Sequence, residues 1–149
     1  MDTSERYLSA ELRVPADDFN RPGTGQWAAL RDHRLTVQRC NTCGKTQNPA
    51  EDICHHCHSF DLGWADVPAR GEIFSWTRVW HPSHPSMKGR TPYLVLWVEC
   101  DHPDQPRFVG NLLGDPTQPV EIGMRVEGVF QDFEDGTLLN WVVANGGPV

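Results

Sequence analysis

The sequence predicts a mainly β protein in which a short helix and a cysteine-clamped ribbon precede a small barrel. Four of the five cysteines form two Cys-x-x-Cys pairs between residues 40 and 57, and five apolar segments follow residue 70 with no long helix between them. Twelve prolines and 13 glycines in 149 residues indicate short elements joined by many turns. The length suits one domain with a small appendage.

Residues 1–38 are predicted to form an N-terminal segment, with a loop rich in proline, glycine and aspartate followed by a helix. Trp27, Leu30 and either Arg34 or Leu35 recur at helical spacing, which predicts a helix near 23–34. Thr24 belongs to the preferred N-cap residue types. Trp27 either anchors this helix on the chain's own core or belongs to an amphipathic helix that docks on a partner protein.

Residues 39–66 are predicted to form a rubredoxin-like metal ribbon. Two Cys-x-x-Cys knuckles with ten residues between them bring four sulfurs to one point, and Gly44 permits the tight turn after the first knuckle. Four thiolates at tetrahedral positions suit Zn²⁺, with iron and electron transfer as the alternative. Such a site has no open position for water or substrate, so the zinc is predicted to be structural. The ligands are Cys40, Cys43, Cys54 and Cys57.

Three histidines flank the second knuckle, at positions 55, 56 and 58. A histidine nitrogen can replace a thiolate as a zinc ligand. Because four cysteines already complete the tetrahedron, these histidines are predicted to lie outside the ligand set.

Residues 67–149 are predicted to form a five-stranded barrel, with strands near 71–80, 92–100, 107–113, 124–133 and 137–144. The first alternates Phe74, Trp76 and Arg78 with Ile73 and Ser75, as in a half-buried strand. Between the last two strands, Asp135-Gly136 predicts a hairpin with a primed turn. A barrel of this length is most economically an OB-fold, although an SH3-like barrel or a small sandwich also fits the pattern.

The sequence lacks the recognised catalytic motifs: it contains no G-x-S-x-G, P-loop, G-x-G-x-x-G or H-E-x-x-H. Cys100 ends an apolar strand and is predicted to be a small buried hydrophobe rather than a nucleophile. The most polar stretch is the proline-rich loop 80–93, which reads either as a recognition loop for CoA or a partner, or as a plain solvated loop. The candidate contacts are Arg78, His81, His84, Lys88, Arg90 and Tyr93.

Charge and hydropathy disfavour two classes of function. The formal net charge of −7 argues against a general nucleic-acid binder, which needs cations to displace counterions from phosphates. No apolar run approaches the roughly 18 residues that span a bilayer. The polar, acidic start lacks the basic and apolar regions of a secretory signal, so a cytoplasmic location is expected, where paired cysteines more often bind metal than form disulfides.

The chain resembles the zinc-ribbon and OB-fold acyl-CoA-associated proteins, the domain of unknown function 35 type. The resemblance runs from about Gly25 to Val143 and rests on ordered motifs: LTVQRC, C-x-x-C-G, a proline, C-x-x-C before an aromatic residue, GEIFSWT, HPSHP, TPY, GNLLGDP and IGMRVEGVF. The family's second knuckle usually reads C-P-x-C-G. This chain has His58 in place of that glycine, so the turn around the metal is expected to differ.

The resemblance implies a non-catalytic accessory subunit. Proteins of this family are similar in assembling with thiolase-like enzymes, including aldolases that cleave side chains of steroid-CoA thioesters, and others pair with hydratases of the hot-dog fold or with acyltransferases. The partner would carry the catalytic residues, and this chain would stabilise it and help shape its acyl-CoA site. The alternatives are a stand-alone module that binds acyl-CoA or a nucleotide, a partner of an enoyl-CoA hydratase, and a binder of single-stranded nucleic acid.

Overall fold

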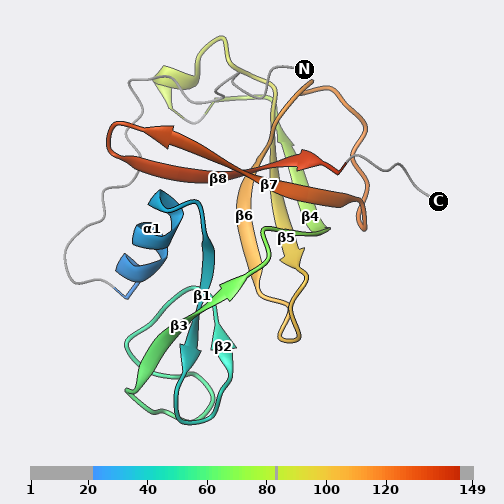
Figure 1. The fold of residues 1–149 in the computed structure, drawn as a ribbon. Coiled ribbons are helices and arrows are strands. Elements are labelled where there is room, and N and C mark those ends of the chain that lie inside the picture. Colours follow the sequence, from blue (N-terminus) through green and yellow to red (C-terminus); the bar gives the residue numbers. More distant parts are fainter. Residues whose placement is uncertain (1–21, 83, 145–149) are drawn as a thin grey trace.

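The computed structural model describes residues 22–82 and 84–144, in which a three-stranded sheet leads into a five-stranded closed barrel (Figure 1). The predicted N-terminal loop before residue 22 lies outside the described residues. The elements are α1 (Thr24–Arg31), β1 (Leu35–Cys40), β2 (Thr46–Gln47), β3 (Leu62–Val67), β4 (Arg70–Val79), the 3₁₀ turn η1 (Pro85–Met87), β5 (Tyr93–Cys100), β6 (Arg107–Leu112), β7 (Arg125–Phe133) and β8 (Gly136–Val143).

The strand order confirms the predicted architecture. The small sheet has the order β2-β1-β3 with antiparallel pairs, and the barrel has the order β4-β5-β6-β8-β7. Antiparallel pairing between β4 and β7 and parallel pairing between β6 and β8 close the barrel, so it has no free sheet edge. Among the described residues, no helix has the length and hydropathy that crossing a membrane requires.

The helix is shorter than predicted. It ends at Arg31 because the chain reverses at His33, which has a φ of 54°, and Leu35 already belongs to β1. The predicted cap is also wrong: Gly23 occupies the N-cap position without a side-chain bond, and Thr24 is the first helical residue. Trp27 packs against the core, so it anchors the helix on the chain itself.

A β-bulge interrupts the alternation that the sequence predicts for β4. The register shifts between Ile73 and Ser75, so that Ile73 pairs with Val98 and Trp76 pairs with Leu96. Both partners on β5 are buried, which places Ile73 and Trp76 on the inner face and leaves Phe74 exposed. Barrels use such bulges to bend strands sharply enough to close.

The β7–β8 hairpin is confirmed, but its turn is displaced by one residue. Phe133 pairs with Gly136, so Glu134 and Asp135 form the loop. Neither these two residues nor Gly136 appears among the described residues with a positive φ angle, so the turn is not of a primed type.

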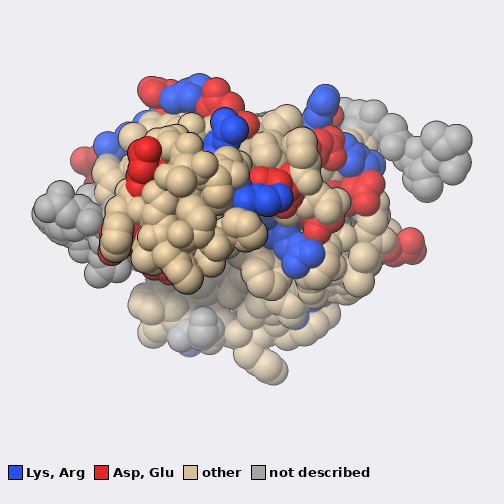
Figure 2. Space-filling model, turned by 90° about the horizontal axis from the view of Figure 1, so that it is seen from below, with Lys and Arg blue, Asp and Glu red and all other residues tan. Residues whose placement is uncertain are grey.

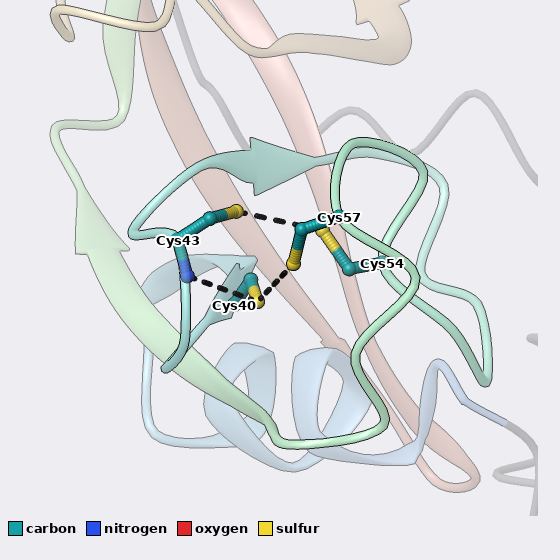
Figure 3. A group of neighbouring side chains, drawn as sticks. All are labelled: Cys40, Cys43, Cys54 and Cys57. Carbon is teal, nitrogen blue, oxygen red and sulfur yellow. Dashed lines mark hydrogen bonds between the residues drawn. The ribbon is translucent and has the colours of Figure 1, made fainter.

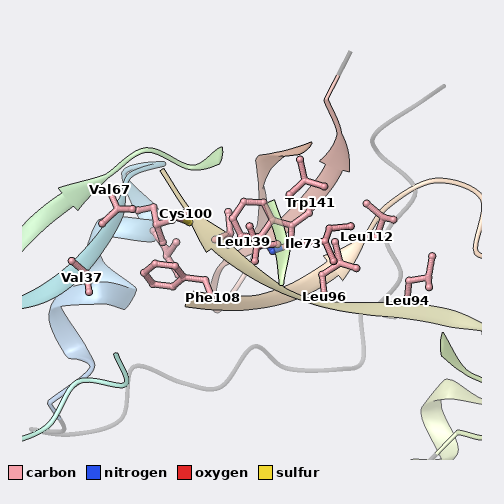
Figure 4. Packing of buried hydrophobic residues seen from close by; sticks show 14 of the residues in the cluster. Val37, Val67, Ile73, Leu94, Leu96, Cys100, Phe108, Leu112, Leu139 and Trp141 are labelled. Carbon is pink, nitrogen blue, oxygen red and sulfur yellow. The ribbon is translucent and has the colours of Figure 1, made fainter. Parts of the chain in front are cut away.

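One hydrophobic core connects the base of the small sheet with the barrel (Figure 4). Val37 and Val67 lie at one end of the cluster, Leu94 lies at the other, and the fully buried Trp141 lies between them. The ribbon is therefore seated on the barrel by shared apolar packing at its base.

Candidate metal centre

The two knuckles gather four sulfur atoms at the end of the ribbon away from the barrel (Figure 3). All four Sγ atoms lie within 4.8 Å of one another. The Sγ atoms of Cys40 and Cys57 are 3.6 Å apart, and those of Cys43 and Cys54 are 3.7 Å apart. Thiolates about 2.3 Å from a tetrahedral ion lie about 3.8 Å from each other, so the cluster fits such an ion.

The two knuckles have the same backbone geometry although their sequences differ. The amide of Gly44, with a φ of 76°, donates to the Cys40 carbonyl at 2.9 Å. His58, with a φ of 61°, repeats this bond by donating to the Cys54 carbonyl at 3.0 Å. The expectation that the missing glycine changes the turn is therefore wrong: His58 adopts the left-handed conformation instead, at a cost of about 1 kcal/mol.

Backbone amides favour the thiolate form at three of the four cysteines, and at Cys54 the amides of Cys57 and His56 lower the pKa. The Cys43 amide donates to the Cys40 sulfur and, with that of Thr42, lowers the pKa of Cys40 to about 6. At Cys57 the Ser59 amide favours the thiolate, but desolvation and the three neighbouring thiols raise the pKa to about 12. Four thiols this close do not ionise together without a cation between them.

Two buried glutamines hold the second knuckle against the ribbon. Gln47 Nε2 donates to Gln38 Oε1 at 2.6 Å and to the Ile53 carbonyl at 3.1 Å, and the His55 amide donates to Gln47 Oε1 at 2.9 Å. Gln38 makes two bonds with the backbone of Glu51. Its Nε2 donates to the Glu51 carbonyl, and its Oε1 accepts from the Glu51 amide. Sequence patterns missed this pair, because an isolated glutamine carries no signal for burial.

The three histidines of the second knuckle are exposed, and the metal-binding group found among the described residues consists of the cysteines alone. The role of His58 is therefore conformational.

The candidate recognition residues lie away from the metal centre. The segment between β4 and β5 lies at the end of the barrel opposite the ribbon (Figure 1). His81, His84, Lys88 and Arg90 are exposed in this segment, and Tyr93 is half-buried at the start of β5.

Arg78 has a structural role at the same end of the barrel. Its Nε donates to the Pro116 carbonyl at 2.9 Å and its Nη2 to the Gln118 carbonyl at 2.6 Å, while the guanidinium lies 5.5 Å from the centre of the Trp76 ring. These bonds hold the β6–β7 connection against β4 and use two of the nitrogens that a phosphate would need.

Cys100 is confirmed as a buried core residue. Burial, and then the adjacent Asp101 carboxylate, raises the pKa of its thiol to about 12. The sulfur is therefore protonated at neutral pH and is a poor nucleophile.

A histidine–carboxylate pair that the sequence did not reveal joins the helix to the barrel. His33 Nε2 lies 2.9 Å from Asp132 Oδ1, and its ring stacks on Phe130 with centroids 5.4 Å apart. The Asp132 carboxylate also accepts a hydrogen bond from Thr137. The contact with His33, and after it the bond from Thr137, lowers the pKa of the Asp132 carboxyl. The partners are 99 residues apart in sequence, so only the fold brings them together.

Family models and solved structures match both halves of the chain. The model for the ChsH2 rubredoxin-like zinc ribbon domain matches residues 27–63, and the model for the ChsH2 C-terminal OB-fold domain matches residues 64–131. A chain of a solved structure described as the Ltp2-ChsH2(DUF35) aldolase is 30% identical, with a TM-score of 0.75, over 88% of this chain and 98% of that chain. The protein belongs to the ChsH2-type DUF35 family.

A more distant solved structure and two longer curated proteins are also similar to this chain. A DUF35 protein of unknown function from Sulfolobus solfataricus is 16% identical with a TM-score of 0.57, which shows the shared fold. Among curated proteins, a probable enoyl-CoA hydratase alpha subunit of Thermomonospora curvata is 34% identical over 75% of this chain. The 3-oxo-4,17-pregnadiene-20-carboxyl-CoA hydratase alpha subunit of Mycobacterium tuberculosis is 30% identical over 84% of it. The chain spans only 34% and 40% of the length of these two relatives.

Proposed function

We propose that this chain is a non-catalytic accessory subunit of a thiolase-like enzyme that cleaves or forms carbon–carbon bonds in acyl-CoA thioesters. The observation that carries the proposal is the match over nearly the whole length of a ChsH2(DUF35) chain in an aldolase structure. The chemistry of the metal centre supports it, because four thiolates leave no coordination position for a substrate. The partner carries the catalytic groups, and this chain stabilises the partner and helps to shape its acyl-CoA site.

The metal in this proposal is zinc. The four cysteines fit a tetrahedral ion, and the ribbon matches a zinc ribbon model. Zinc binding supplies folding free energy and no chemical step. Metal analysis of the purified protein is expected to give one zinc per chain and a colourless solution, whereas a coloured protein containing iron would favour electron transfer instead.

Complex formation tests the subunit proposal. The chain is co-expressed with a candidate Ltp2-like subunit chosen from its own genome, and the mass of the purified material is measured by light scattering after size exclusion. We expect a single species whose mass requires both chains. Two separate species at micromolar concentration would contradict the proposal.

A hydratase is the second candidate partner, because both curated relatives are named as hydratase alpha subunits. The same mass measurement with the hot-dog-fold hydratase subunit of the same genome distinguishes the two. Preferential assembly with the hydratase would replace the thiolase-like partner in the proposal.

The loop after β4 is proposed to contact CoA or the partner through His81, His84, Lys88, Arg90 and Tyr93. Of the six contact residues predicted from the sequence, Arg78 is the least suited to bind a phosphate, because its guanidinium already donates to two backbone carbonyls. Calorimetry with CoA and with an acyl-CoA tests whether the isolated chain binds the nucleotide part. No heat at millimolar ligand would exclude stand-alone CoA binding.

A further inference from the structure

The outer face of the barrel carries three large apolar side chains next to one another. Trp97 on β5 pairs across the ladder with Val109 on β6, and its ring meets that of Phe74 on β4 edge to face, with centroids 6.2 Å apart. The exposed fractions are 47% for Trp97, 61% for Val109 and 40% for Phe74. We call these three residues the Trp97 surface. The bulge in β4 creates it, because the register shift leaves Phe74 on the outer face beside Trp97.

Hollows lie on both sides of the Trp97 surface. A shallow dent of about 200 Å³ lies over the bulge, between Trp76, Thr77 and Val95. A larger groove of about 800 Å³ separates the ribbon and α1 from the barrel. Trp97 and Val109 line both hollows, so the apolar face and the groove are continuous. Contiguous exposed apolar surface of this kind marks interaction sites in soluble proteins.

The charged side chains that line the groove neutralise one another. Arg107 Nε lies 2.9 Å from Glu99 Oε2, and Lys45 Nζ lies 3.8 Å from Asp104 Oδ1. These are the four Lys, Arg, Asp and Glu residues of the lining. On the face seen from below, Figure 2 shows blue and red atoms side by side and broad tan areas without Lys, Arg, Asp or Glu. Among the described residues of this lining, both the lysine and the arginine are paired with carboxylates, which disfavours a phosphate chain or nucleic acid as the occupant.

The chemistry of this surface matches the core of a protein–protein interface. Such cores are depleted in charged residues and enriched in tryptophan, phenylalanine and arginine, a description that fits Trp97 and Phe74 with Arg107 beside them, whereas the charged pairs of the groove resemble the polar rim. The Arg107 guanidinium lies 3.5 Å from the centre of the Phe74 ring while it is paired with Glu99, so both side chains are held in place before any partner arrives.

We propose that the Trp97 surface and the adjoining groove are the docking surface for the thiolase-like partner subunit, which inserts a neutral, apolar segment beside Trp97. This inference rests on the proposed function and adds the location of the interface. It assigns the partner to the side of the barrel that faces the ribbon, and leaves the loop after β4 to other contacts.

The test compares Trp97→Ser and Val109→Glu with Phe60→Ser. Phe60 is a matched control because it is 78% exposed on the ribbon and lines neither hollow. The dissociation constant for the Ltp2-like subunit of the same genome is measured for each folded variant. Trp97→Ser and Val109→Glu are each expected to weaken binding about thirtyfold or more, the effect of losing about 2 kcal/mol. Phe60→Ser is expected to change the dissociation constant less than about threefold.

The outcomes separate this inference from the proposed function. Wild-type affinity in both surface variants would overturn the inference while leaving the subunit role intact, and so would a loss of affinity only in Phe60→Ser. A wild-type chain that does not bind would overturn both. If the surface variants instead dissociate a homodimer of this chain and leave partner binding unchanged, the surface contacts a second copy of the chain and the inference is wrong.

Discussion

The ribbon and the barrel are both small antiparallel structures, yet they bury different kinds of side chain. The barrel encloses aliphatic residues and Trp141, with exposed fractions near zero. Beyond its base, the ribbon buries polar groups and sulfur instead, namely Gln38, Gln47, Cys40 and Cys54. A sheet of three short strands cannot bury enough apolar surface to compensate the entropy of ordering its chain.

The difference indicates which forces hold each part. The barrel depends on hydrophobic packing, whereas the knuckle end of the ribbon depends on metal–sulfur bonds and on amide hydrogen bonds. The shared core at the base joins the two parts. Substitutions at the knuckles and in the barrel are therefore expected to produce different signatures.

Loss of a zinc ligand is expected to have the largest effect. Cys43→Ser removes one of four thiolates, so the chain should retain less than one metal ion and lose amide protection in residues 40–60, and partner assembly should fall with it. Metal analysis and hydrogen exchange measure this. Cys100→Ser is the matched control, because it changes a buried cysteine outside the cluster and should leave zinc content unchanged. A Cys43→Ser chain that folds, assembles and retains zinc normally would show that our account of the ribbon is wrong.

A cavity in the barrel is expected to have the opposite signature. Leu96→Ala removes a fully buried side chain and should lower the free energy of unfolding by about 3 kcal/mol. The folded protein should still hold one zinc, because no knuckle residue changes. Denaturant unfolding gives the stability, and a chelator titration of the folded state gives the metal affinity. Zinc loss equal to that of Cys43→Ser would contradict the separation of the two parts.

The glutamine pair provides an intermediate case. Gln47→Met keeps the volume but leaves the His55 amide and the Ile53 carbonyl without their partner, which should cost about 2 kcal/mol and speed zinc loss to a chelator. Gln118→Met removes a single bond to the Leu113 carbonyl outside the ribbon and should leave the rate of zinc loss unchanged. Equal rates in the two variants would remove the positioning role of Gln47.

The smallest effect is expected at the left-handed positions of the two knuckles. His58→Gly relieves a positive φ angle and should stabilise the protein by about 0.5 to 1 kcal/mol. Gly44→Ala should destabilise the protein by about 1 kcal/mol, because alanine is strained at this positive φ angle. Steric overlap adds little to this cost, because an added Cβ meets only the end of the Arg39 side chain. Chemical denaturation of the zinc-loaded protein checks both, and changes of the same sign would contradict the conformational equivalence of the knuckles.

The sequence was informative where a local pattern corresponds to a local structure. The spacing of the cysteines predicted the ligand set that the fold brings together, and the apolar segments after residue 70 predicted five strands. The turn at Glu134–Asp135 was displaced by one residue because strand pairing, rather than the preference of Asp135-Gly136, sets the register of the hairpin.

Features that depend on closure or on long-range packing could not be predicted. Nothing near Phe74 signals the bulge, which comes from the curvature of the barrel, and the alternation predicted for β4 failed there. The His33–Asp132 pair depends on the seating of α1 against the β7–β8 hairpin. The Trp97 surface depends on the bulge in β4 and on the pairing of β5 with β6, so the sequence alone did not predict it.

The most direct test of the accessory role is the activity of the Ltp2-like subunit of the same genome with and without this chain. Carbon–carbon bond cleavage of a steroid-CoA thioester is followed while wild-type chain is added to the purified subunit, with the Cys43→Ser chain as the control. The account predicts that soluble, active enzyme increases with wild-type chain until the two are stoichiometric, and that the control gives much less. An Ltp2-like subunit that is equally soluble and equally active alone would contradict the account.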